Sequence, residues 1–129
     1  HHNLTVEEVI KQKNLHPEAK VLVHPECTAG VLKTADYIGS TTGIMNYVKN
    51  SGEKSFIIVT EIGVTERLKR DYPDKEFIHI SNKAVCQSMK LITPEDIYNS
   101  LINETFEITV PEDIIKPAYK PIEKMIKVS

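Results

Sequence analysis

The chain has 129 residues, 40% of them hydrophobic, and a formal net charge of -2, with 16 Lys and Arg against 18 Asp and Glu. This length suits one domain or slightly more, and the composition excludes a disordered tail. Because no run of about 18 apolar residues occurs, we exclude a membrane-spanning protein, and the lack of a basic excess argues against nucleic-acid binding.

The two cysteines, Cys27 and Cys86, are too few for a disulfide-stapled secreted domain. No signal peptide is visible, so we expect a cytoplasmic protein. The chain opens on His1 and His2 without an initiator methionine. This start indicates either a tag remnant or a piece of a longer protein.

Helices and strands alternate along the first two thirds of the chain. Thr5 and Glu8 form a capping box, which predicts a helix ending near His16. Short apolar runs predict strands at 20–23, 36–39, 55–60 and 76–80, with helices between them at about 29–35, 44–50 and 63–70. Alternation at this spacing is typical of βαβ units, so we predict an α/β fold, a three-layer α-β-α unit with a short parallel sheet.

The last third of the chain reads differently. Thr93 and Pro94 form a cap and a first helical position, which predict a helix to about Ile102. Alternating residues at 106–110 predict a further strand, and an apolar stripe after Pro111 predicts a last helix. We therefore expect a leading helix in 1–18, an α/β domain in 19–82, and in 83–129 a loop that contains Cys86, followed by C-terminal helices.

His24, Pro25, Glu26 and Cys27 follow the first predicted strand directly. Ligands of open parallel sheets bind outside the carboxyl ends of the strands, so these side chains are a candidate site. His24 could exchange a proton near neutral pH, and Glu26 could act as a base. Alternatively, the segment is only a tight turn with Cys27 buried as a small hydrophobe.

Hydroxyl-bearing and acidic residues follow the next two strands. Ser40 and Thr41 open a helix, where backbone N–H groups would suit a phosphate or carboxylate, although ordinary capping would also explain them. Thr60 and Glu61 end the third strand in the same way. We expect Glu61 mainly to favour the helix N-terminus, with a place in the crevice as the alternative.

Cys86 falls in a polar segment after the α/β unit, where it is either structural or a ligand of a soft metal or iron–sulfur cluster. Within this chain only Cys27 could assist it, and two thiolates do not make the usual cluster set. His16 and His79 are isolated, and we expect surface and half-buried strand positions for them.

Four short motifs occur together in one order and at a consistent spacing. They are His24-Pro25-Glu26-Cys27, the segment 35–41, Thr60-Glu61-x-Gly63, and Cys86-x-x-Met89-Lys90. In this combination, over nearly the whole chain, the sequence resembles the quinolinate synthase family. The resemblance implies one of three similar α/β domains around a pseudo-threefold axis, with the active site where the domains meet.

The resemblance also implies an activity. Members of the family condense iminoaspartate with dihydroxyacetone phosphate to quinolinate, the pyridine precursor of NAD, with a 4Fe-4S cluster as Lewis acid. Cys86 matches one of three cluster cysteines, and His24 and Glu26 match residues that contact substrate and move protons. Ser40 and Thr41 match a turn that binds a substrate carboxylate or phosphate. The other cluster cysteines belong upstream, so we expect this chain alone to bind no stable cluster and to be inactive.

Two other functions fit the general α/β pattern. The first is a metal-free enzyme that binds a phosphorylated sugar and uses His24 and Glu26 as acid and base. The second is a non-catalytic module that binds a small anion or a partner protein. Iron dependence separates the first from the family's chemistry, and tolerance of substitutions at His24, Glu26 and Cys86 would indicate the second.

Overall fold

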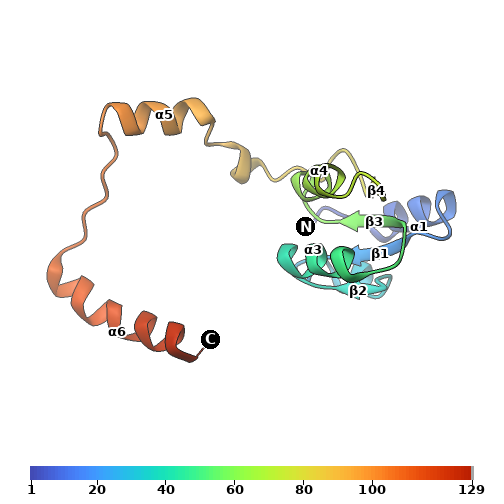
Figure 1. Ribbon diagram of the computed structural model, residues 1–129, viewed down its shortest axis with the longest axis horizontal. Coiled ribbons are helices and arrows are strands. Elements are labelled where there is room, and N and C mark those ends of the chain that lie inside the picture. The colour runs from blue at the N-terminus through green and yellow to red at the C-terminus, as the bar shows by residue number, and fades with distance from the viewer. Residues whose placement is uncertain (129) are drawn as a thin grey trace. The chain divides into compact units, whose positions relative to one another are not determined.

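The computed structural model describes residues 1–128, which divide into two units along the chain, the first ending at Ser88 and the second beginning at Met89 (Figure 1). The first unit contains every strand that the described residues form. The second contains helices joined by segments without regular secondary structure. Helix α1 and residues 83–88 belong to the first unit together with the predicted α/β domain, whose exact limits stay a prediction.

The sheet of the first unit is parallel and has four strands in the order β2-β1-β3-β4. The strands are β1 (Lys20–Val23), β2 (Tyr37–Ile38), β3 (Ser55–Val59) and β4 (Glu76–His79). From β1 the chain first moves to β2 on one side and then crosses to β3 on the other. The carboxyl ends of β1 and β3 therefore flank the topological switch point, where ligands of open α/β sheets bind.

Helices cover both faces of this sheet (Figure 1). On one face, α1 (Val6–Leu15) and α2 (Ala29–Leu32) pack over the odd-numbered side chains of β1 and β3. On the other face, α3 (Thr41–Asn50) and α4 (Ile62–Asp71) pack over Leu22, Phe56 and Ile58. The predicted three-layer α/β fold is confirmed, and burial on both faces explains why β1 and β3 are continuously apolar.

Local signals in the sequence position two of the helices. The Thr5 side chain accepts a hydrogen bond from the Glu8 N–H and the Glu8 carboxylate accepts one from the Thr5 N–H, so the predicted capping box opens α1. Before α3, a Cβ atom at Gly39 would lie 2.6 Å from the Tyr37 ring. Glycine at this position lets the chain turn from β2 into α3 beneath that ring.

The second unit carries α5 (Pro94–Ile102) and α6 (Glu112–Val128), preceded by a single 3-10 turn, η1 (Gln87–Lys90), that begins in the first unit. Thr93 caps α5 as predicted. The predicted strand at 106–110 is wrong, because no strand lies there. Phe106 has a φ of 64°, outside the extended region, and a strand also needs a neighbour whose backbone it can bond.

Within residues 1–128, no helix combines the length and the apolar composition that crossing a membrane requires.

Candidate active site

The first strand ends in a sharp turn that carries a half-buried His24 and an exposed Glu26. The His24 N–H donates to the Val59 carbonyl (3.1 Å), which joins the ends of β1 and β3 one residue beyond the strand itself. Pro25 then lacks the N–H that would continue the ladder, and the Cys27 N–H closes the turn on the His24 carbonyl (3.0 Å). The two predicted site residues therefore lie at the switch point of the sheet.

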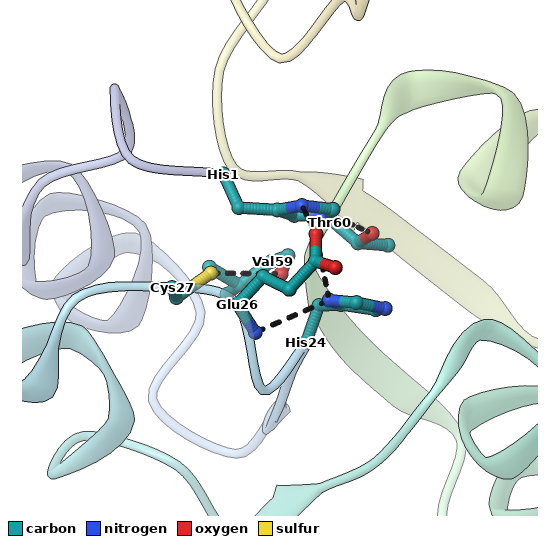
Figure 2. Close-up of polar contacts among 6 residues, drawn as sticks. All are labelled: His1, His24, Glu26, Cys27, Val59 and Thr60. Atoms are coloured by element: carbon teal, nitrogen blue, oxygen red, sulfur yellow. Dashed lines mark hydrogen bonds and ion pairs between the residues drawn. The ribbon is translucent and has the colours of Figure 1, made fainter.

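His1 lies in the same place, although it is far from His24 in the sequence. The two imidazole rings stack with centroids 4.2 Å apart and an interplanar angle of 9° (Figure 2). The Nδ1 atom of His1 is 3.0 Å from a Glu26 carboxylate oxygen, and its Nε2 atom is 2.9 Å from the Thr60 hydroxyl. His1 thus connects the turn after β1 with the end of β3.

The hydrogen bonds assign proton positions in this group. A carboxylate only accepts, so His1 Nδ1–H donates to Glu26 and His1 Nε2 accepts the Thr60 hydroxyl proton when the ring is neutral. His24 Nδ1 accepts the Glu26 N–H (3.3 Å), so neutral His24 carries its proton on Nε2. The His24 side chain is 14% exposed and that of Glu26 70% exposed. His24 Nε2 and the Glu26 carboxylate are therefore the groups able to exchange a proton with a bound molecule.

The same three side chains are the candidate metal-ligating group within residues 1–128. One ligand atom each from His1, His24 and Glu26 lies within 4.8 Å of the others. Two imidazoles and a carboxylate are a donor set that divalent transition metals accept. In the arrangement present, however, His1 bonds the Glu26 carboxylate and the Thr60 hydroxyl, and His24 Nδ1 accepts from the Glu26 backbone N–H, which favours a proton-handling site.

Ser40 and Thr41 lie at the neighbouring strand end. The Gly39 N–H donates to the Val23 carbonyl (3.1 Å), so the turn after β2 is joined to the end of β1. The Ser40 hydroxyl accepts from the Gly43 N–H (3.1 Å) and caps α3. Capping thus accounts for the Ser40 side chain, while Thr41 is the exposed first residue of the helix.

Glu61 lies at the helix N-terminus, as expected, and caps it through its side chain rather than through the dipole alone. Its carboxylate accepts from the Gly63 N–H (2.7 Å), and the residue is 8% exposed at the start of α4. The first N–H groups of α4 are bonded inside the protein, since Ile62 donates to the Ala84 carbonyl and Val64 to that of Glu61. The N-terminus of α4 is therefore not a free anion-binding site.

The two cysteines differ in accessibility. Cys27 is buried, its thiol lies 3.7 Å from the Val59 carbonyl, and burial raises the pKa of that thiol. Cys27 therefore behaves as a small protonated core residue. Cys86 is exposed, two residues after Ala84, whose carbonyl binds the start of α4. Cys86 is thus the accessible thiol of the first unit, whereas Met89 falls in the second unit.

His1 is the site residue that sequence reasoning missed. It precedes the first helix, carries no periodic signal, and contacts residues more than 20 positions away. The usable signal was a histidine a few residues before the capped helix that precedes the first strand. His16 and His79 lie where we expected, partly exposed, and His79 bonds Glu66 (2.9 Å) away from the site.

Known proteins are similar to this chain over almost its whole length. A family model described as quinolinate synthetase A protein matches residues 1–127. The chain is 47% identical over 128 residues to a quinolinate synthase of Clostridium kluyveri, covering 99% of the chain and 42% of that protein. It is 46% identical over 129 residues to quinolinate synthase 2 of Methanosarcina acetivorans, covering 100% and 42%. The chain therefore spans 42% of the length of these curated relatives.

Proposed function

The chain belongs to the quinolinate synthetase A family, and on that premise we propose that it forms part of an enzyme that makes quinolinate for NAD biosynthesis. In this proposal the complete protein condenses iminoaspartate with dihydroxyacetone phosphate. The observation that carries the proposal is the convergence of His1, His24, Glu26 and Thr60 at the switch point of the sheet. This is where a substrate of an open α/β sheet binds.

His24 and Glu26 are the proposed proton-transfer residues. The Nε2–H of His24 can donate to a substrate oxygen, and the exposed carboxylate of Glu26 can accept a proton from carbon or nitrogen. His1 and Thr60 position this pair, because His1 bonds both the Glu26 carboxylate and the Thr60 hydroxyl. Both proposed substrates are anionic, so hydrogen-bond donors such as the Nε2–H of His24 suit their carboxylate and phosphate oxygens.

Ser40 and Thr41 are proposed to bind a carboxylate or phosphate of the substrate. They open α3, whose N-terminal dipole end favours an anion. The hydrogen bond from Gly39 to Val23 places this turn beside the end of β1, where His24 begins the candidate site. A hydroxyl at Thr41 would supply a further donor there.

Cys86 is proposed as one ligand of a 4Fe-4S cluster. Cluster ligands are thiolates, and the exposed Cys86 can reach a cluster shared with residues outside this chain, whereas Cys27 is buried in the core of the first unit. The remaining ligands would come from outside this chain, which agrees with its covering 42% of the relatives. When bound, the cluster would supply an open iron as a Lewis acid for dehydration. On its own the chain is expected to bind no stable cluster and to be inactive.

Iron content tests this proposal directly. We would purify the full-length gene product anaerobically and measure iron and acid-labile sulfide per chain, with Cys86→Ser and Cys27→Ala as matched variants. We expect cluster loss with Cys86→Ser and retention with Cys27→Ala, since Cys27 is buried. No iron in the unmodified protein would overturn the proposal.

Activity tests the proton-transfer residues separately. His24→Ala and Glu26→Gln should lower kcat by about 10²- to 10⁴-fold with iron content unchanged. His16→Gln is the matched control, because His16 lies away from this site and its nearest charged partner is Glu76. Unchanged kcat in both site variants would remove His24 and Glu26 from the chemistry.

A further inference from the structure

Backbone hydrogen bonds beyond the strands join the segments at the carboxyl edge of the sheet. The Gly39 N–H binds the Val23 carbonyl and the His24 N–H binds the Val59 carbonyl, each at 3.1 Å. A third bond, from the Ile62 N–H to the Ala84 carbonyl, is 2.8 Å long. It connects the start of α4 with the segment that follows β4. The segment that follows β4 is thus attached to the carboxyl edge of the sheet, like the segments that follow β1, β2 and β3.

Ala84 is held by three contacts. Its own N–H donates to the Ser81 carbonyl (3.0 Å), and its side chain is 8% exposed in the core cluster that contains Leu4 and Ile80. Its carbonyl accepts from Ile62. The next residues, Val85 and Cys86, are exposed. Ala84 is therefore the last anchored residue before the Cys86 thiol.

This anchoring limits where the thiol can go. Successive Cα atoms are about 3.8 Å apart, so the Cα of Cys86 lies within about 7.6 Å of that of Ala84. Ile62 itself follows Thr60 of the candidate site by two residues. A single methyl group buries little apolar surface, so the directional restraint on this segment comes from the hydrogen bond.

We propose that Ile62 is a positioning residue whose backbone N–H, through the Ala84 carbonyl, places the Cys86 thiol at the edge of the candidate site. The inference rests on the proposed role of Cys86 as a cluster ligand. The anchoring itself does not depend on iron and can be measured apart from it.

Proline at position 62 removes this hydrogen bond selectively. Ile62 is the first residue of α4, the helical position at which proline is best tolerated. The preceding residue, Glu61, has a ψ of 138°, which a following proline accepts. The matched control is Ile62→Ala, which also shortens the half-buried side chain but keeps the N–H.

The first measurement is amide hydrogen exchange at Ala84 in the full-length gene product. We expect exchange about tenfold faster in Ile62→Pro than in Ile62→Ala, because one backbone hydrogen bond of the anchored segment is missing. Amides of β1 and β3 should exchange alike in the two variants, which shows that the sheet is intact. Equal exchange at Ala84 would overturn the anchoring.

The second measurement is the rate at which the anaerobically purified protein loses iron to a chelator. Ile62→Pro should lose iron several-fold faster than Ile62→Ala, with equal melting temperatures. Faster exchange at Ala84 with equal iron loss would overturn the positioning role. Retention of iron by Cys86→Ser would instead contradict the proposed function, while the exchange result would still decide the anchoring.

Discussion

The two units of the chain place their apolar residues in opposite environments. The first unit buries whole side chains on both faces of its sheet, and Leu22, Phe56 and Ile58 are completely buried. The second unit has no buried residue between positions 89 and 128, although its helices carry many large apolar side chains. A core therefore stabilises the first unit, whereas the described residues of the second unit form no core.

Helix α6 shows this difference most clearly. It has a one-sided apolar stripe that includes Ile115, Ile122 and Met125, yet these side chains are 47% to 63% exposed. Pro117 and Pro121 also lie inside it, and each removes a backbone hydrogen bond. Most helical stability in proteins comes from packing of such a stripe. We therefore expect α6 to be marginal within this chain, and the following predictions test the comparison.

The largest effect should come from truncating a core ring. Phe56→Ala should lower the free energy of unfolding of the first unit by about 3–5 kcal/mol. Phe56 is fully buried, and its ring stacks on that of Phe77 with the ring centroids 5.7 Å apart. The matched variant Ile122→Ala should change this free energy by less than about 0.5 kcal/mol. Urea unfolding followed by circular dichroism measures both. A comparable loss in the two variants would contradict the division into a self-sufficient and a dependent unit.

A smaller effect separates the two capping boxes. Thr5→Ala should lower the unfolding free energy of the first unit by about 1 kcal/mol, because α1 packs on its core. Thr93→Ala should instead speed amide exchange in the first turn of α5 and leave the first unit's unfolding midpoint unchanged. The serine variants keep a capping hydroxyl and are the controls. A shift of that midpoint by Thr93→Ala would show that the units unfold together.

Local sequence patterns, such as apolar runs and helix caps, predicted most of the fold. The apolar runs at β1 and β3 and the caps at Thr5 and Thr93 each have a local physical cause, so they could be read from the sequence. The strand expected at 106–110 failed for the opposite reason. Alternation is a local pattern, but a strand also needs a partner strand, which local reasoning does not supply.

The candidate site was predictable in part for the same reason. His24 and Glu26 follow a recognisable strand, so the rule that ligands bind at carboxyl ends located them. His1 was missed because its contacts with Glu26 and Thr60 span 25 and 59 positions and depend on how α1 packs on the sheet. The hydrogen bonds that join neighbouring strand ends at the carboxyl edge of the sheet were likewise visible only in the structure.

The smallest effects are titrations that should occur at different pH in the two units. Burial and the nearby Lys69 lower the pKa of His79 in the first unit, against the opposing effect of Glu66. As pH falls, His79 is therefore protonated in the unfolded chain, where a histidine has a pKa of about 6.5, before it is protonated in the folded unit. As pH falls below that value the first unit should lose stability, since the unfolded state takes up more protons. His79→Gln should remove this component from the pH dependence of urea unfolding.

In the second unit the relevant group is Asp96. Hydrogen bonds from the Thr93 hydroxyl and backbone N–H lower the pKa of Asp96, so the cap of α5 is complete above the unfolded-state pKa of about 3.9. Its contribution is lost only as pH falls through the lower, folded-state pKa. Between pH 7 and 5, amide exchange in α5, corrected for its intrinsic pH dependence, should therefore stay constant while the first unit weakens. Asp96→Asn should show the same α5 exchange at both pH 5 and pH 3. If α5 and the sheet instead lost protection over the same pH range, the two units would share one cooperative transition.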